Sequence, residues 1–276
     1  MNDTIEITIV TADQMQREQL IGQLASIEFD GFEEEENELK AYIQAANFNM
    51  AELEHVLTSL NLGYTSRVIP AQNWNAVWES NFSPVIVESF CAIRADFHHP
   101  VSGVKHEIII TPKMSFGTGH HATTYLMISG MKRIDFANKK VADFGTGTGI
   151  LAILAEKLGS NAVWAIDIDE WSIENARENI DRNNCKRVVL EMKNGFETEE
   201  TFDIILANIN KYVILDNLNK LFHGCKRSTQ LLISGLLKTD EAEVISAFER
   251  VGLTYLSTIE KDNWICLSFQ YHLKSE

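Results

Sequence analysis

The fold of this chain is decided by the stretch VADFGTGTG at residues 141–149, which runs directly into the apolar segment ILAIL at residues 150–154. The stretch has the pattern of an apolar strand end, an acid, and three glycines at alternate positions before a helix. Glycines permit a tight turn after a strand and let a ligand approach the main chain closely. The first turn of the following helix has N–H groups without partners inside the helix. This pattern is typical of a loop that binds a nucleotide-like ligand.

Two classes of ligand compete for such a loop, and the glycine spacing separates them. Dinucleotide-binding enzymes space their glycines G-x-G-x-x-G and place a pyrophosphate at the helix N-terminus. Here the third glycine, Gly149, comes one residue early, and Ile150 stands where that pattern has glycine. Asp143 would repel a diphosphate but suits a ligand with a cationic amine, such as S-adenosylmethionine. The stretch therefore favours a methyltransferase, with a glycine-rich turn that binds no ligand as the alternative.

A second acid follows the next expected strand. The segment VWAID ends in Asp167, 22 residues after Gly145. Doubly wound folds place at about this spacing the carboxylate that holds a ribose diol. Enzymes that use NAD share this feature, so Asp167 indicates a nucleoside site without choosing the cofactor. Asp169, which precedes Glu170, is the better candidate for a helix N-cap.

The composition indicates a globular protein, and 276 residues with 45% hydrophobic content are enough for a full core and two domains. The net charge of −15 argues against direct binding to nucleic acid. No apolar run approaches the roughly 18 to 20 residues that span a bilayer, and the N-terminus lacks a signal-peptide pattern. We therefore expect a cytoplasmic protein without membrane association, and we expect it to be a monomer.

The cysteines and histidines do not suggest a metal centre. The four cysteines lie far apart and the histidines form no helical ligand pair, so we expect no metal and reduced, buried cysteines. The charge is uneven along the chain, because residues 1–70 hold thirteen acids and three basic residues, a net charge of −10. An acidic lobe speeds the encounter with a basic partner, although the run Glu33–Glu36 also fits a solvated loop.

Residues 1–70 alternate between strand and helix patterns, which predicts a small α+β lobe. Its expected elements are, in order, a strand at 5–10, a helix at 13–27, strands at 27–32 and 39–43, a helix from Asn49 to Gly63, and a strand at 64–69. The order β-α-β-β-α-β is that of the ferredoxin-like split motif. Because the lobe has no obvious catalytic residue, we predict that it recognises the substrate.

The rest of the chain is expected to hold a linker at 71–100 and a catalytic domain at 101–276. An amphipathic helix at 73–82 carries Trp74 and Trp78, which we interpret as packing anchors rather than ligand contacts. From residue 138 the patterns alternate as in a doubly wound parallel sheet. We predict strands near 140–143, 162–167, 188–192, 203–208 and 230–235, helices near 149–158, 170–182, 211–222 and 240–250, and antiparallel strands at 253–259 and 264–271.

Three further segments carry a resemblance to a known family. The segment FGTGHHATT at 116–124 resembles the signature FGTGTHPTT, with His120 and Ala122 as departures, and DIILANI at 203–209 is similar to a strand end written DVVVANI. Trp74 and Trp78, followed by Phe82 and Pro84, match a W-x-x-x-W…F-x-P stretch. From about residue 73 to its end the chain resembles the PrmA family, the ribosomal protein L-eleven methyltransferases. In the N-terminal lobe only the element order agrees.

The resemblance implies a Rossmann-like class I methyltransferase core with a C-terminal antiparallel strand, plus a small ferredoxin-like lobe that holds the protein substrate. It implies S-adenosylmethionine as cofactor, and lysine side-chain amines and the N-terminal amine of ribosomal protein L-eleven as methyl acceptors. The cofactor positions that it carries over are Thr124, Gly145, Asp167 and Asn208.

Other site residues are predicted from the loop and the strand ends. The glycine motif adds Asp143, Gly147 and Gly149 to the cofactor site. Asn194, after the third strand, is a candidate contact for adenine or else part of a plain turn. Asn208 is the candidate catalytic residue that orients the amine, with a helix N-cap before Lys211 as the alternative.

No side chain in the sequence stands out as a general base. The same core also fits a methyltransferase for another protein or a small molecule, and a scaffold that binds cofactor without catalysis. The acidic lobe argues against a small-molecule substrate. The intact Asp143, Asp167 and Asn208 argue against a scaffold.

Overall fold

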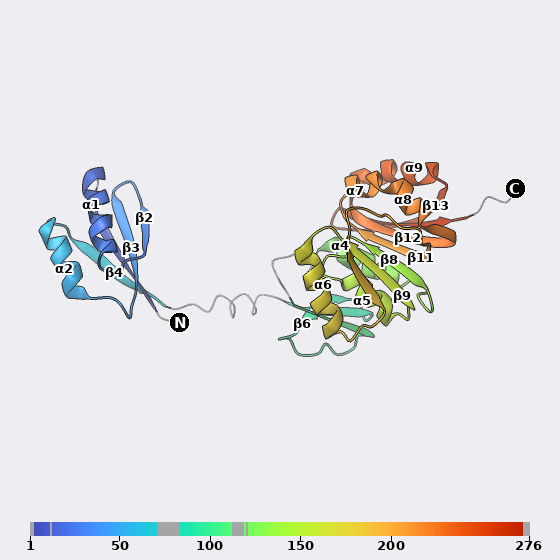
Figure 1. The fold of residues 1–276 in the computed structure, drawn as a ribbon, viewed down its shortest axis with the longest axis horizontal. Coiled ribbons are helices and arrows are strands. Elements are labelled where there is room, and N and C mark those ends of the chain that lie inside the picture. The colour runs from blue at the N-terminus through green and yellow to red at the C-terminus, as the bar shows by residue number, and fades with distance from the viewer. Residues whose placement is uncertain (1–2, 12, 71–82, 112–118, 120, 273–276) are drawn as a thin grey trace. The chain divides into compact units, whose positions relative to one another are not determined.

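The computed structural model describes residues 3–11, 13–70, 83–111, 119 and 121–272 (Figure 1). The chain divides into two compact units, Met1–Asn81 and Phe82–Glu276. The second unit begins earlier than the expected residue 101, because strands β5 (Val85–Val87) and β6 (Cys91–Ala95) contribute side chains to its core. The helix expected at 73–82 lies outside the described residues.

The first unit has the predicted element order. A four-stranded antiparallel sheet of order β2-β3-β1-β4 carries two helices. Inward-facing residues of the strands and helices, such as Ile7, Leu24 and Leu57, form a separate buried core. Its elements are β1 (Thr4–Val10), α1 (Gln14–Ala25), β2 (Gly31–Glu34), β3 (Glu38–Gln44), α2 (Met50–Ser59) and β4 (Tyr64–Ile69).

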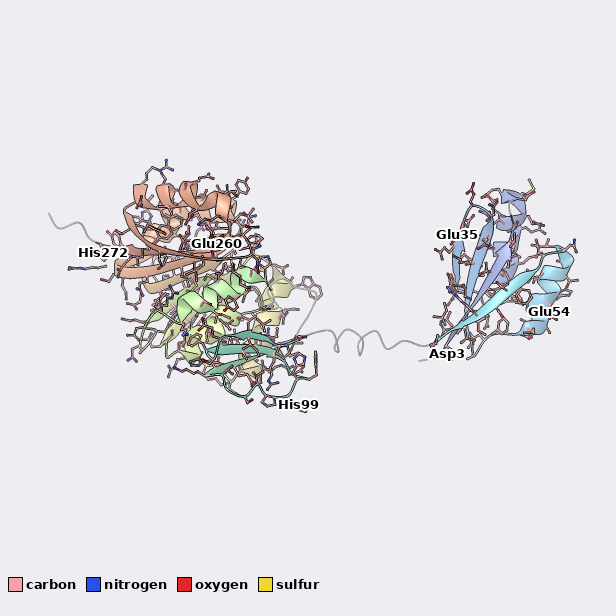
Figure 2. All side chains as sticks on the ribbon, turned by 180° about the vertical axis from the view of Figure 1, so that it is seen from behind. Asp3, Glu35, Glu54, His99, Glu260 and His272 are labelled. Carbon is pink, nitrogen blue, oxygen red and sulfur yellow. The ribbon has the colours of Figure 1, made fainter. Side chains whose placement is uncertain are left out.

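The acidic run Glu33–Glu36 of this unit is exposed to solvent, as predicted, but only its second half is a loop. Glu33 and Glu34 end β2 and pair with β3, so the turn begins only at Glu35. The buried guanidinium of Arg17 holds the hairpin, since Nη2 donates to the carbonyls of Thr11 at 2.8 Å and Glu36 at 3.2 Å. Glu35, after β2, and Glu54, on α2, lie on different sides of the unit (Figure 2), so its acidic residues do not all share one face.

The second unit is built on a seven-stranded sheet of order β10-β9-β8-β11-β12-β14-β13. The five strands from β10 to β12 are parallel, and β14 pairs antiparallel with β12 and with β13. This is the predicted doubly wound sheet with an antiparallel end. The strands are β8 (Lys140–Phe144), β9 (Ala162–Asp167), β10 (Val188–Met192), β11 (Phe202–Asn208), β12 (Cys225–Leu237), β13 (Leu253–Lys261) and β14 (Trp264–Tyr271).

Helices cover both faces of this sheet, which explains the near-continuous apolar character of its central strands. Residues of α4, α5 and α6 share one buried core with alternate strand residues, and residues of α7, α8 and α9 share the other (Figure 1). The helix expected at 211–222 is split at Asn217. The helices are α4 (Ala122–Met131), α5 (Ile150–Lys157), α6 (Glu170–Arg182), α7 (Lys211–Asp216), α8 (Leu218–His223) and α9 (Glu241–Arg250), with a short 3₁₀ turn at Lys238–Asp240.

A small second sheet completes the unit. Strands β5, β6 and β7 (His106–Ile110) form it, and β7 packs against α5 and α6. The four cysteines are buried and unpaired. Across the residues that the structure describes, there is no group of metal-ligating side chains and no helix long and apolar enough to cross a membrane.

Candidate functional site

A cavity of about 590 Å³ opens at the carboxyl ends of the central strands. The chain runs from β8 to β9 and β10 on one side and then returns to β11 on the other side of β8. Ligands of doubly wound sheets bind at such a switch in strand order. The volume lies within the usual range for small-molecule sites. The residues that line the cavity include His121, Thr123, Thr124, Gly145, Gly147, Thr148, Asp167, Asn194, Asn208, Ile209, Asn210, Gly235 and Trp264.

The glycine loop forms one wall of this cavity and is tied to the neighbouring strand. The N–H groups of Gly145 and Thr146 both donate to the carbonyl of Ile166 at 2.9 Å. Gly145, Gly147 and Gly149 all have positive φ, at 74°, 54° and 82°, which other residues rarely adopt. Gly145 and Gly147 line the cavity, whereas Gly149 begins α5 and packs on Ala176. The main chain of the loop is therefore open to a ligand.

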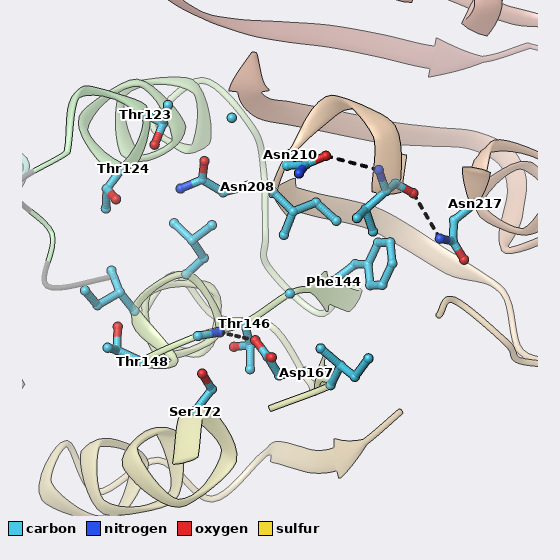
Figure 3. A pocket seen from close by; sticks show the side chains of 18 of the residues that line it. Thr123, Thr124, Phe144, Thr146, Thr148, Asp167, Ser172, Asn208, Asn210 and Asn217 are labelled. Atoms are coloured by element: carbon cyan, nitrogen blue, oxygen red, sulfur yellow. Dashed lines mark hydrogen bonds between the residues drawn. The ribbon is translucent and has the colours of Figure 1, made fainter. Parts of the chain in front are cut away.

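Asp167 lies at the end of β9, beside this loop. Its Oδ2 accepts the N–H of Gly147 at 2.8 Å, and its Oδ1 accepts the N–H of Asp169 at 3.0 Å. Two backbone amides thus hold the carboxylate in place, and each oxygen keeps a lone pair for a further donor. Figure 3 shows Asp167 and Ser172 on one side of the cavity, with Thr123, Thr124 and Asn208 on the other. As predicted, Asp169 caps α6, because its Oδ2 accepts the N–H of Ser172.

The structure does not bring Asp143 to the cavity. Its side chain is 1% exposed and is not among the cavity-lining residues, so the predicted contact with the cofactor has no support in the geometry. Oδ2 accepts a hydrogen bond from the Thr146 hydroxyl at 2.7 Å, whereas Oδ1 has no well-formed hydrogen bond. Burial raises the pKa of Asp143 to about 7, although the Thr146 hydroxyl and the Ala152 N–H act in the opposite direction. Asp143 supports the glycine loop from beneath.

Asn208 is the last residue of β11, and it lines the cavity. The helix N-cap is not Asn208 but Asn210, whose Oδ1 accepts the N–H groups of Tyr212 at 2.8 Å and Val213 at 3.3 Å. Among the described residues the side chain of Asn208 has no hydrogen-bond partner. Its amide is therefore available to a ligand.

Gly235 is a cavity residue that sequence reasoning missed. It lies where the pairing of β12 with β14 is irregular, between Ile233 and Leu236, and its φ is +86°. A Cβ built on Gly235 would come within 2.1 Å of the Ile209 carbonyl oxygen, so only glycine lets β12 approach the segment after Asn208 this closely. Its only sequence signal was an isolated glycine inside a strand pattern.

The N-terminus of α4 brings the signature to the cavity. The His121 side chain caps the helix, because its Nδ1 accepts the N–H of Thr123 at 3.3 Å. The ring also contacts Trp264 edge-on, with centroids 4.6 Å apart. Trp264, at the start of β14, is a second lining residue that the sequence did not suggest. Thr124 also lines the cavity, and so does Asn194, which follows β10.

Most of the predicted cofactor residues meet around this one cavity: Thr124, Gly145, Gly147, Asp167, Asn194 and Asn208. The other two, Asp143 and Gly149, lie behind the loop. Their chemistry fits a nucleoside with a polar tail. Asp167 has acceptor capacity left for a diol, and the glycine loop allows close approach of the ligand.

Together, the doubly wound sheet with its antiparallel end and the cavity at its switch in strand order define a class I S-adenosylmethionine-dependent methyltransferase. The same fold occurs in a methyltransferase from Pyrococcus furiosus, with a TM-score of 0.51 and 21% identity over 60% of this chain and 90% of that one. The sequence profile of ribosomal protein L11 methyltransferase (PrmA) matches residues 3–272. The chain belongs to the PrmA family.

Two relatives illustrate the family match. The chain is 38% identical over 272 residues to a ribosomal protein L11 methyltransferase of Porphyromonas gingivalis, covering 96% of this chain and 92% of the relative. The crystal structure of a ribosomal protein L11 methylase from Lactobacillus delbrueckii subsp. bulgaricus superimposes with a TM-score of 0.65 and 29% identity. That match covers 69% of this chain and 100% of the other.

Proposed function

We propose that this enzyme methylates lysine side-chain amines and the N-terminal amine of ribosomal protein L11. The observation that carries the proposal is the meeting of Asp167, the glycine loop, Thr124 and Asn208 around one cavity at the switch in strand order. Family membership supports both the cofactor and the protein substrate.

The arrangement of polar groups supports one placement of the cofactor. Asp167 would accept hydrogen bonds from the ribose diol, Asn194 would lie beside the adenine, and Thr124 and Asn208 would lie toward the reacting end. Gly145 and Gly147 would let the cofactor lie close to the main chain. When bound, S-adenosylmethionine supplies a methyl group already activated by its sulfonium.

The protein's part in the reaction is to position the amine. Asn208 has a free side-chain amide at the end of β11, and its oxygen is suited to orient an amine N–H toward the reacting centre. The amine must arrive neutral, because an ammonium has no lone pair. Among the described lining residues, the titratable side chains are His121, Asp167 and Lys193, and none lies free beside Asn208 as a base. His121 Nδ1 lies 3.3 Å from the N–H of Thr123 and 2.8 Å from its hydroxyl, so this nitrogen is engaged at the start of α4.

The first unit is proposed to recognise the substrate. It is a separate compact unit, its sequence has no glycine-rich loop like that of residues 145–149, and it carries most of the excess negative charge. We further infer that the enzyme acts as a monomer in the cytoplasm, where ribosomal proteins are made, and that it binds the protein substrate without direct contact to nucleic acid.

The test is methyl transfer from labelled S-adenosylmethionine to purified ribosomal protein L11, with the modified amines mapped by mass spectrometry. We expect Asp167→Ala to weaken cofactor binding by roughly 1–3 kcal/mol, because a charge-assisted hydrogen bond is lost. We expect Asn208→Ala to slow methylation by about a hundredfold through loss of positioning.

Asp169→Ala is the matched control, because it removes a nearby carboxylate and a helix cap but no cavity-lining side chain. It should lower stability while leaving cofactor affinity nearly unchanged. Label that enters other ribosomal proteins but not L11 would refute the proposed substrate. NAD that binds as tightly as S-adenosylmethionine would refute the placement of the cofactor.

A further inference from the structure

Helix α6 and its C-cap carry three asparagines at four-residue spacing, Asn175, Asn179 and the C-cap Asn183. This spacing puts all three on one face of the helix. Asn175 and Asn179 are fully buried. Asparagine is a modest helix former and costly to bury without partners, so its repetition on a buried face points to specific hydrogen bonds.

Asn179 joins two parts of the chain that are far apart in the sequence. Its Oδ1 accepts the N–H of Thr111 at 2.8 Å, and its Nδ2 donates to the carbonyl of Thr148 at 2.9 Å. The same Nδ2 also donates to Asn175 Oδ1 at 3.2 Å. The buried amide thus has a partner for its oxygen and for both of its hydrogens.

One of the two partners of Asn179 lines the cavity, and the other lies at the end of a strand. Thr148 is part of the glycine loop and lines the cavity. Thr111 directly follows β7, so Asn179 ties the glycine loop to the end of a strand in the small sheet.

We propose that Asn179 is a positioning residue for the cofactor, which holds the glycine loop in place against the end of β7. This inference rests on the proposed placement of the cofactor in the cavity. Asn179 does not line the cavity and acts only through the two backbone groups that it holds. Without its side chain, the Thr148 carbonyl and the Thr111 N–H each lose a well-aligned partner, and the Thr148 end of the loop is held less tightly.

Asn183 provides a matched control one helical turn further along. Its Oδ1 accepts the N–H of Ile109 at 3.0 Å, and its Nδ2 donates to the carbonyl of Ile109 at 2.6 Å. Asn183 therefore makes two side-chain bonds to β7, and its Nδ2 also donates to the Asn179 carbonyl at 2.8 Å. It makes none to the glycine loop.

The experiment compares Asn179→Ala with Asn183→Ala in the full chain. The dissociation constant of S-adenosylmethionine is measured by calorimetry, and the folded fraction is checked by urea unfolding. Both variants lose side-chain bonds that tie this helix and its C-cap to β7 and Thr111, so a loss that came only from loosening this contact would appear in both. We expect Asn179→Ala to raise the dissociation constant about tenfold, the effect of losing one buried hydrogen bond, and Asn183→Ala to raise it by less than about twofold.

Equal changes in the two variants, or an unchanged dissociation constant in Asn179→Ala, would overturn the proposal. If Asn179→Ala does not fold, Asn179→Thr, which leaves less of a void, is compared with Asn183→Thr by the same criterion. Asp167→Ala separates this inference from the placement of the cofactor. If Asp167→Ala binds S-adenosylmethionine with unchanged affinity, the proposed placement of the cofactor is refuted. If Asp167→Ala binds it weakly and Asn179→Ala binds it with unchanged affinity, only the role of Asn179 is refuted.

Discussion

Asp143 and Asp167 lie at the ends of the neighbouring parallel strands β8 and β9, beside the glycine loop, but their surroundings differ. Asp167 faces the cavity and is held by two backbone amides. Asp143 lies beneath the loop, where burial keeps its pKa near 7. The chemistry of a carboxylate thus depends on which side of the loop it occupies.

Asp143→Asn should become more stable relative to the wild type as the pH rises. The pKa of Asp143 is about 7 in the folded state against 3.8 for the unperturbed group. Between these values the native state binds more protons than the unfolded state, so this carboxyl costs the wild type stability with increasing pH. Urea unfolding at pH 6 and pH 8.5 should show a relative gain of about 1 kcal/mol for the variant. A stability difference that does not change with pH would show that the carboxyl titrates normally.

The acceptor amine provides a second prediction at this scale. Since Nδ1 of His121 is engaged by the N–H and the hydroxyl of Thr123, we expect no internal base to deprotonate lysine. Single-turnover methylation of lysine should therefore speed up from about pH 7 to 9, because each unit below a pKa near 10.4 leaves tenfold less neutral amine. The α-amine, with a reference pKa near 8, should level off earlier. A flat lysine profile with chemistry limiting would reveal a base, and His121→Asn would test the only cavity-lining histidine among the described residues.

At the scale of elements, close backbone contacts set the shape of the site. The irregularity in β12 brings Gly235 against Ile209, directly after Asn208. A Cβ on Gly145 would likewise come within 2.1 Å of Ile209 Cγ2. Ile209 thus packs closely against two glycines, Gly145 and Gly235, and these contacts hold the end of β11 in place.

Gly235→Ala should slow methylation by about a hundredfold, because the added methyl group displaces the Ile209 carbonyl and with it Asn208. Gly103→Ala is the matched control. Gly103 also has a positive φ, +82°, but a Cβ there meets no atom within 4 Å. The control should lose about 1 kcal/mol of stability to backbone strain and keep its methylation rate. Equal rates in both variants would mean that the contact with Ile209 does not position Asn208.

The split between α7 and α8 is another effect of contacts between elements. The apolar spacing of residues 211–222 predicted one helix. Asn217 instead uses its side chain to accept the Phe196 N–H at 3.0 Å and to donate to the Val213 carbonyl at 2.9 Å. A segment that follows β10 therefore interrupts a helix that local propensity would have continued.

At the scale of the whole molecule, the two units have separate cores and different charge. We expect a truncated chain that starts at Asn73 to keep its affinity for S-adenosylmethionine, since every described cavity-lining residue lies in the second unit. The truncated chain should lose methylation of intact ribosomal protein L11. Calorimetry and methylation of L11, each beside the full chain, check the two halves of this prediction. Undiminished methylation would show that residues 1–70 are dispensable for recognition.

The sequence by itself determined the order of strands and helices, the glycine loop, the acid at Asp167 and the antiparallel end of the sheet. These features follow from apolar periodicity and turn chemistry, which act over a few residues. The signature segments also identified the family, because they combine several such features in one order.

Only the tertiary structure decided which of the predicted residues meet. It placed Asp143 behind the loop, brought Gly235 and Trp264 to the cavity, and joined Thr111 to Thr148 through Asn179. The bonds of Asn179 span 68 and 31 residues along the chain. Burial, close approach and shared hydrogen bonds depend on such distant partners, and no local pattern in the sequence records them.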